Sequence, residues 1–278
     1  MLHTSPQFRP KPQYPTYPPY HVGDYLEDYF YNQFTQDMPN VTRDYIAVSW
    51  TTLYCDNKTE GLQDFLNSLD PTKKYFTILQ HDDAPKHTLP PNTICFSAGG
   101  NVISDKTVPI PLICSKLPPI ESSEKKYLAT FVGSNTHPIR QIMCAALQEK
   151  NNCPIYLKNW SPHVNKNEFD LFIEYATQSK YLLCPRGYGL NSFRLYEAFQ
   201  LNCVPVIITD KMYLPWQDEL DWTTFSVPIN NNDISSLYEK LNSISEDKYM
   251  KLLNHGKEIY ESHFSLNGMY NNIIKRLK

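Results

Sequence analysis

The chain has 278 residues, 20% of them charged, and a formal net charge of -3 at pH 7. Acidic and basic side chains are nearly balanced, so the sequence offers no basic surface of the kind that binds nucleic acid, and we expect no nucleic-acid partner. No run approaches the roughly 20 apolar residues that a membrane-spanning helix needs. The N-terminal segment has no apolar core typical of a signal peptide, so a cytoplasmic location is the default expectation.

The seven cysteines are scattered along the chain, and none forms a CxxC pair. Zinc sites normally use such closely spaced cysteines, so we expect no zinc site. Most of the cysteines lie in apolar runs, which is typical of reduced, buried thiols.

The first half of the chain predicts an α/β domain. Residues 1–22 are rich in proline and lack a hydrophobic period, which predicts an extended N-terminal arm on the surface. In residues 23–115, periodic apolar residues predict helices over 24–34 and 60–69. Apolar runs predict strands over 45–50, 75–80, 94–98 and 108–113. Alternation of this kind favours a parallel sheet.

The second half repeats the alternation after a polar, proline-containing stretch over 116–126, which we interpret as a linker. Strands are predicted over 127–133, 154–158, 181–185 and 204–209, with helices over 137–150, 168–180 and 191–200. These elements place a second α/β domain over 127–245, and further helices are expected to fill the rest of the chain to residue 278. Two α/β domains joined by a linker predict a ligand site in a cleft between them.

The run from 181 to 216 contains the residues best suited to chemistry. A buried strand ends in Cys184-Pro185, and Arg186-Gly187-Tyr188-Gly189 then leads into a helix that begins near Asn191 or Ser192. Glycines allow a sharp turn close to a ligand, and the free N–H groups of a helix N-terminus suit a diphosphate. Arg186 is placed to bind phosphate oxygens, and Glu197 is placed to reach a ribose hydroxyl pair.

An ordinary structural interpretation of the same run also stands. Glycine-rich turns between a strand and a helix are frequent in proteins that bind nothing there. Arg194 and Glu197 are three residues apart and can form an ion pair on the helix surface. Phe193, Tyr196 and Phe199 are expected to pack in the core.

The complete run closely resembles the signature of the exostosin-like, family 47 glycosyltransferases. Its pieces are Cys184-Pro185-Arg186-Gly187, Ser192-Phe193-Arg194, Glu197-Ala198, the strand from Val204 to Asp210, and Leu214-Pro215-Trp216. Further similar stretches are Asp221-Trp222 with Phe225-Ser226-Val227, Phe131-Val132-Gly133-Ser134 with Arg140, Tyr75 to Asp82, and Asp105 to Pro111. The resemblance is strong over about 125–245 and weaker over 40–115.

The resemblance implies the GT-B fold, in which two Rossmann-like domains face each other across a cleft. It also implies a UDP-sugar donor held mainly by the C-terminal domain, inversion at the anomeric carbon, a glycan acceptor, and no required metal or cofactor. The candidate donor contacts are Gly133, Ser134, Arg140, Arg186, Gly187, Tyr188, Asn191, Ser192, Phe193 and Glu197. Residues 246–278 are expected to form helices that cross back onto the acceptor-side domain, as is common in GT-B chains.

The chain departs from the family in two respects. Cellular members usually carry an N-terminal membrane anchor, which we do not expect here, and the N-terminal half of this chain is short. The chain resembles a compact, soluble version such as those of large algal DNA viruses. Of the sugars that family members use, xylose is our first expectation and galactose the second. A glucuronate donor calls for an extra cation, for which Lys158 and Lys211 are the candidates.

Transfer also requires a base that takes the proton of the acceptor hydroxyl. The cluster His81-Asp82-Asp83 follows a predicted strand, and we place Asp82 ahead of Asp83 and His81 for this role. The same cluster supports an alternative fold, because a strand that ends in two aspartates is also how metal-dependent GT-A transferases hold Mn²⁺. A second alternative is a non-catalytic carbohydrate-binding protein, against which the presence of Arg186 and Glu197 argues. A Rossmann dehydrogenase is disfavoured because the GxGxxG motif is absent.

Overall fold

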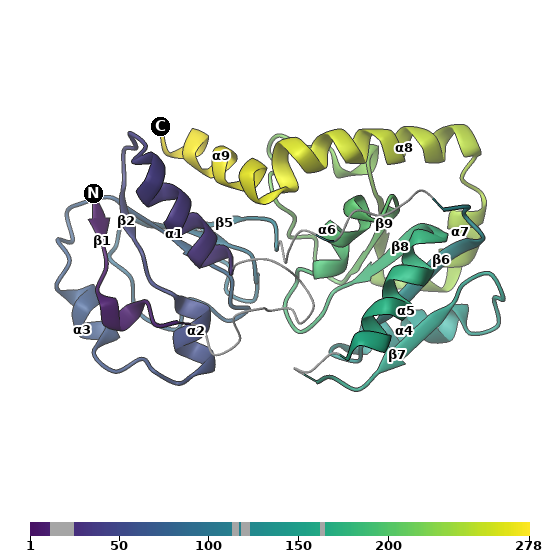
Figure 1. Cartoon of the computed structure of the whole chain (residues 1–278), viewed down its shortest axis with the longest axis horizontal. Coiled ribbons are helices and arrows are strands. Elements are labelled where there is room, and N and C mark those ends of the chain that lie inside the picture. The colour runs from purple at the N-terminus through teal and green to yellow at the C-terminus, as the bar shows by residue number, and fades with distance from the viewer. Residues whose placement is uncertain (12–24, 113–116, 118–122, 162–164) are drawn as a thin grey trace.

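The computed structural model describes residues 1–11, 25–112, 117, 123–161 and 165–278. These residues form two lobes that lie side by side (Figure 1), each built on a five-stranded sheet in which every strand pair is parallel. The α/β class is therefore confirmed, as is the division into two parallel sheets that the GT-B resemblance implies. The single-sheet GT-A alternative is not retained.

The first sheet has its strands in chain order. They are β1 (Leu2–His3), β2 (Asp44–Ile46), β3 (Tyr75–Leu79), β4 (Thr93–Ser97) and β5 (Thr107–Pro109). Three helices accompany them: α1 (Leu26–Asp37), α2 (Trp50–Cys55) and α3 (Leu62–Asn67). Because successive strands always add on the same side, this sheet lacks the reversal of strand order that defines a doubly wound Rossmann sheet.

Strand β3 shows why the first sheet is covered on both faces, since all five of its side chains are buried. Alternate side chains of a strand point to opposite faces. Phe76 and Ile78 pack with Phe30 of α1, whereas Tyr75 and Leu79 pack with the apolar residues of α2 and α3. A continuous apolar run is what a strand buried on both faces requires.

The N-terminal residues correct one prediction. Residues 1–11 do not form a surface arm: Leu2–His3 is the edge strand of the first sheet and Phe8, in a short 3₁₀ helix (Pro6–Phe8), is fully buried. The strand is held by hydrogen bonds from the N–H of Tyr45 to the carbonyl of Met1 and from the N–H of Ala47 to that of His3. The remainder of the predicted arm, residues 12–22, lies outside the described residues.

The second sheet has the strand order β10-β9-β8-β6-β7. Its strands are β6 (Tyr127–Ser134), β7 (Ile155–Lys158), β8 (Ser179–Pro185), β9 (Val204–Thr209) and β10 (Val227–Asn230). Renumbered within this lobe, the order is the flavodoxin-like 2-1-3-4-5. The strand order therefore reverses between β6 and β8, and in open parallel sheets ligands bind at the carboxyl ends of the strands at such a point.

Helices cover both faces of this second sheet. One face packs on α4 (Pro138–Leu147), α7 (Leu237–Asn242) and α8 (Glu246–Ile259), and the other packs on α5 (Lys166–Thr177) and α6 (Phe193–Gln200). Short 3₁₀ helices lie at Trp222–Thr224 and Asn231–Ser236. None of the helices in the described ranges is long and apolar enough to cross a bilayer.

The end of the chain lies on the first lobe. A π-helical turn (Tyr260–Phe264) follows α8, and α9 (Leu266–Leu277) then runs across to lie beside α1 (Figure 1). The ring of Tyr270 packs on that of Phe30 with centroids 5.2 Å apart. Thr42 donates from both its N–H and its hydroxyl to the carbonyl of Leu277, at 2.9 and 2.7 Å. One hydrophobic cluster consequently runs through both lobes.

Several strands and helices begin or end at residues other than those predicted. The strand predicted over 45–50 ends at Ile46, because Trp50 begins α2 and donates its indole N–H to Thr77 of the neighbouring strand. The helix predicted to residue 180 ends at Thr177, because Ser179 already belongs to β8. Strand β10 was not predicted. Of the predicted linker, only residues 117 and 123–126 are described, and they carry no helix or strand before β6 begins at Tyr127.

Candidate functional site

The carboxyl ends of the two sheets meet where the Arg186–Leu190 turn lies against the residues that follow β3 and β4. The clearest link is Asn191, whose amide donates to the carbonyls of Ala98 and Ile110 in the first lobe, at 3.1 and 3.4 Å. Its oxygen accepts from the N–H of Ser192 and the hydroxyl of Tyr196. An amide side chain can make four such bonds, and all four are made. Asn191 therefore joins the lobes through its side chain, and its role as a donor contact stays a prediction.

Arg140 lies at the point where the strand order reverses. It is buried at the start of α4 and donates to three backbone carbonyls: Ser134 at the end of β6 at 2.7 Å, Pro185 at 3.1 Å and Arg186 at 2.9 Å. Burial lowers the pKa of its guanidinium to about 10. Arg140 thus ties the ends of β6 and β8 together, so its direct role is to hold the turn that follows β8.

Arg186 is the first residue of that turn. Its backbone N–H bonds the carbonyl of Ile208 in β9, and its guanidinium donates to the carbonyl of Tyr188 at 3.0 Å and to the carboxylate of Asp210 at 2.8 Å. This hydrogen bond from Arg186 lowers the pKa of Asp210. The side chain of Arg186 is 12% exposed and that of Asp210 44%, so a mostly buried guanidinium already has an anionic partner beside it.

Gly189 allows the turn to touch the predicted base. A Cβ on this residue would lie 2.1 Å from the Oδ1 atom of Asp82 and 2.8 Å from the carbonyl oxygen of Gly99. No side chain fits there, which is a physical reason for glycine at this position. The structure therefore places Asp82 of the first lobe directly against the Arg186–Leu190 turn of the second.

The acidic cluster is organised around this contact. Burial, and to a smaller extent the charge of Asp83, raise the pKa of Asp82 to about 6, although Arg186 acts in the opposite direction. Asp83 accepts from the hydroxyl of Tyr188 at 3.1 Å and from the amide of Asn101 at 2.9 Å. Burial also lowers the pKa of His81, whose Nδ1 atom accepts from the N–H of Asp83. A carboxyl group with a pKa near 6 suits proton transfer close to neutral pH.

Two predicted donor contacts lie on α6, Ser192 at its start and Glu197 in its second turn, and they differ in their surroundings. Ser192 is the N-cap of α6 but its side chain makes no capping bond, so the first N–H groups of the helix carry no side-chain cap. Glu197 is fully buried and forms an ion pair with Arg194, whose guanidinium lies 3.8 Å from the ring centre of Phe172. The predicted pair forms, but inside the protein, and Glu197 offers no exposed oxygen to a ribose in this structure.

The other predicted donor contacts lie around the turn. Gly133 and Ser134 are the last two residues of β6, and Gly187 packs against Arg140 and Thr136. Tyr188 is 60% exposed, whereas Phe193 packs partly against the core. Lys158 forms an ion pair with Glu168 of α5, and Lys211 is exposed. Over the described ranges, no three His, Cys, Asp or Glu side chains are grouped so as to hold a metal ion.

Two contacts at this edge were not predicted. Asp210 pairs with Arg186, and the ring of Tyr213 lies 3.0 Å from where a Cβ of Gly100 would be. The signal available for Asp210 was its place directly after β9, because the carboxyl ends of neighbouring parallel strands lie at the same edge. Gly100 has a φ of +88°, a conformation that favours glycine, but nothing local in the sequence indicates which side chain packs on it.

The arginine turn and the N-terminus of α6 thus lie at the switch point of a parallel sheet, which is where open α/β proteins bind their ligands. The family model for the Exostosin GT47 domain matches residues 31–244, and the chain belongs to this family of glycosyltransferases.

Relatives in other organisms agree with this family. A probable glycosyltransferase of Arabidopsis thaliana is 33% identical over 149 residues, which is 53% of this chain and 29% of the relative. An exostosin-1 homolog of Caenorhabditis elegans is 27% identical over 159 residues, 51% of this chain and 41% of the relative. A probable glucuronosyltransferase of Oryza sativa is 28% identical over 46% of this chain and 30% of its own length. The chain thus matches less than half the length of each of these relatives.

Solved structures with a similar outline include an α1,3-fucosyltransferase with GDP-fucose, at a TM-score of 0.42 and 15% identity over 77% of this chain and 82% of that one. A TarM variant of S. aureus in complex with UDP has a TM-score of 0.43 and 10% identity, over 79% of this chain and 58% of that one. Scores this low assign neither fold nor activity, and the fold described above rests on the strand order.

Proposed function

We propose that the chain is an inverting glycosyltransferase that moves a sugar from a UDP-sugar to a hydroxyl group of a glycan acceptor. The observation that carries the proposal is the contact between the Arg186–Leu190 turn and the Asp82 carboxylate across the two lobes. Family membership supports transfer chemistry, and the contact brings together a cationic turn for a leaving diphosphate and a carboxylate for an attacking hydroxyl.

The second lobe supplies the donor side. Negative charge grows on the diphosphate as the glycosidic bond breaks, and preorganised donors stabilise it. Arg186 and the N-terminal end of α6 serve this purpose, and Arg140 holds the turn in place. Donor binding exchanges the Asp210 carboxylate for phosphate oxygens as the partner of Arg186, so the guanidinium keeps an anionic partner in both states.

The first lobe supplies the base. The acceptor hydroxyl loses its proton to the carboxylate of Asp82 as its oxygen attacks the anomeric carbon from the face opposite the leaving UDP. The transition state has oxocarbenium character, as in glycoside hydrolysis. A pKa near 6 leaves Asp82 ionised at neutral pH and basic enough to accept a proton. Asp83 is already committed to Tyr188 and Asn101, which favours Asp82 for this role.

For the donor sugar we propose xylose first and galactose second. A glucuronate donor, as the name of the rice relative indicates for that protein, requires a cation near the sugar carboxylate. Lys158 is paired with Glu168, which leaves Lys211 as the exposed candidate. UDP-xylose, UDP-galactose and UDP-glucuronate are therefore compared side by side. The acceptor glycan, a cytoplasmic location and an origin in a large algal DNA virus stay predictions from the sequence.

The test is Arg186→Ala, with Arg276→Ala as the matched control. Both arginines form carboxylate pairs and are mostly buried, but Arg276 pairs with Asp218 and Glu219 beside α9. We expect Arg186→Ala to lower the rate of UDP release with acceptor by about 10²-fold to 10³-fold, as for loss of one preorganised donor, whereas Arg276→Ala keeps the wild-type rate. Equal rates for the two variants would contradict the role of Arg186.

The non-catalytic alternative is separated by calorimetry combined with an assay for donor hydrolysis. A carbohydrate-binding protein binds UDP-sugars without releasing UDP, even over hours. A transferase slowly hydrolyses its donor when the acceptor is absent, because water takes the place of the acceptor hydroxyl.

A further inference from the structure

A second carboxyl group of the first lobe is buried close to the proposed base. Glu27, in the first turn of α1, is 1% exposed, and burial raises its pKa to about 8. Its oxygens accept from the N–H and the hydroxyl of Thr51 at 2.9 and 3.0 Å, and from the N–H of Gln80 at 2.9 Å. Burying a carboxyl group is unfavourable unless it is well hydrogen-bonded. The position therefore calls for an explanation beyond core packing.

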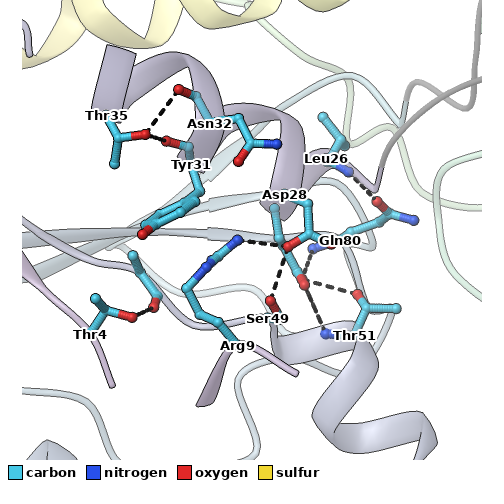
Figure 2. Close-up of polar contacts among 12 residues, drawn as sticks. Thr4, Arg9, Leu26, Asp28, Tyr31, Asn32, Thr35, Ser49, Thr51 and Gln80 are labelled. Atoms are coloured by element: carbon cyan, nitrogen blue, oxygen red, sulfur yellow. Dashed lines mark hydrogen bonds and ion pairs between the residues drawn. The ribbon is translucent and has the colours of Figure 1, made fainter. Parts of the chain in front are cut away.

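The bond to Gln80 is one half of a reciprocal pair. The side-chain oxygen of Gln80, which is itself buried, accepts from the N–H of Leu26 at 2.7 Å, while the side chain of Glu27 accepts from the N–H of Gln80. Figure 2 labels the neighbours of this arrangement: Leu26 at the start of α1, Gln80 directly after β3 and Thr51 in the first turn of α2. We call this arrangement the Glu27–Gln80 clamp.

The clamp holds the residue that precedes the acidic cluster. Gln80 comes directly after β3, and His81-Asp82-Asp83 follow it. The residues of this acidic cluster are not part of the sheet. The backbone of the cluster is held by a bond from the N–H of Ala84 to the carbonyl of His81 at 3.2 Å and one from the N–H of Asn101 to the carbonyl of Asp82 at 3.1 Å. The clamp is thus the last fixed point of the chain before Asp82.

The chemistry of the site explains why a carboxyl group stands at position 27. Three donors converge on it: two N–H groups and one hydroxyl. A carboxyl group offers two oxygens to these donors and keeps acceptor capacity on them even when it carries a proton, whereas a glutamine has one oxygen and turns an NH₂ group, which accepts nothing, toward one of the donors. Glutamine is the same size, so the difference between the two residues is in hydrogen bonding rather than in packing.

We propose that Glu27 is a positioning residue that, through Gln80, fixes the Asp82 carboxylate against the Arg186–Leu190 turn. This inference rests on the proposed function, in which Asp82 takes the proton of the acceptor hydroxyl. Glu27 touches neither substrate. Its effect is confined to the transfer step, because the donor is held by the other lobe.

The test compares Glu27→Gln with Asp28→Asn. Asp28 is the next residue of α1, and its side chain accepts bonds from Arg9 in the N-terminal segment and from Ser49 just before α2. We expect Glu27→Gln to lower kcat for sugar transfer by about 10-fold to 100-fold, since displacement of a catalytic group by about 1 Å has effects of this size. The KM for the UDP-sugar stays within two-fold of wild type, and Asp28→Asn leaves both constants unchanged.

Hydrogen exchange provides a readout that does not depend on activity. In Glu27→Gln the backbone amides of Asp83, Ala84 and Asn101 exchange faster than in wild type, and in Asp28→Asn they do not. Gln80→Met, which removes only the bond to Leu26, gives the same pattern and serves if Glu27→Gln does not fold. If Glu27→Gln changes neither kcat nor the hydrogen exchange of these amides, the proposal is overturned. A rise in the KM for the UDP-sugar that matches the fall in kcat also overturns it. A wild-type protein that transfers no sugar refutes the proposed function instead, and the exchange data still decide whether the clamp holds the cluster.

Discussion

Replacing Gly189 by alanine tests whether the contact between the lobes matters for catalysis. The added Cβ would lie 2.1 Å from Oδ1 of Asp82, whereas ordinary contacts begin at 3.4 Å, so the two groups must separate by about 1.3 Å, the difference between these distances. Overpacking of this kind costs about 1–3 kcal/mol. A displacement of about 1 Å at a catalytic group lowers turnover by roughly 10²-fold.

The assay measures kcat and donor KM for Gly189→Ala alongside Gly187→Ala. Gly187 lies in the same turn, but its Cβ would meet the Nη2 atom of Arg140 at 3.1 Å, which a shift of a few tenths of an ångström relieves. We expect Gly189→Ala to lower kcat about 10²-fold with little change in affinity for UDP, and Gly187→Ala to have the smaller effect on kcat. If Gly189→Ala transfers sugar as fast as wild type, the approach of Asp82 to the turn has no catalytic meaning.

Three further predictions concern titration and support of the site. Because Asp82 must be ionised to act as a base, kcat/KM should rise as the pH increases through about 6. In a pH–rate profile, Asp82→Asn should abolish this rise and Asp83→Asn should keep it. The pKa of Glu27 is about 8 in the folded protein and 4.5 in the unfolded chain, so the free energy of unfolding should fall as the pH rises between these values, by about 5 kcal/mol at most at roughly 1.36 kcal/mol per pKa unit. Urea unfolding at pH 5 and pH 9 should show a smaller loss of stability for Glu27→Gln than for wild type, and equal losses would contradict the raised pKa. Arg140→Met should destabilise the protein by on the order of 3 kcal/mol or more, because three carbonyl groups lose their partner, and a melting temperature equal to that of wild type would exclude this bracing role.

The elements of the second lobe other than β10 were predicted because their signals are local. The run from 181 to 216 contains a strand, a glycine-containing turn, a helix and a strand in immediate succession, and each has its own apolar period. The position of Arg186 at the end of β8 follows from that order alone. The i,i+3 spacing of Arg194 and Glu197 also predicted their ion pair.

What the sequence could not indicate depends on residues far apart in the chain. Burial of the pair between Arg194 and Glu197 depends on Phe172 of another helix. Asn191 looked like a helix cap, but its amide is used by carbonyl groups 81 and 93 residues away. The two residues of β1 are too few to show any period, so an edge strand was taken for a surface arm.

The path of α9 has a consequence for the order in which the protein becomes complete during synthesis. Phe30 of α1 is covered by Tyr270, and Thr42 bonds a carbonyl 235 residues later in the chain. The first lobe therefore keeps an apolar face open to water until the twelve residues of α9 have been synthesised. A shortened chain that stops before Leu266 contains every residue of the proposed site, yet it exposes this face, and such surfaces promote aggregation.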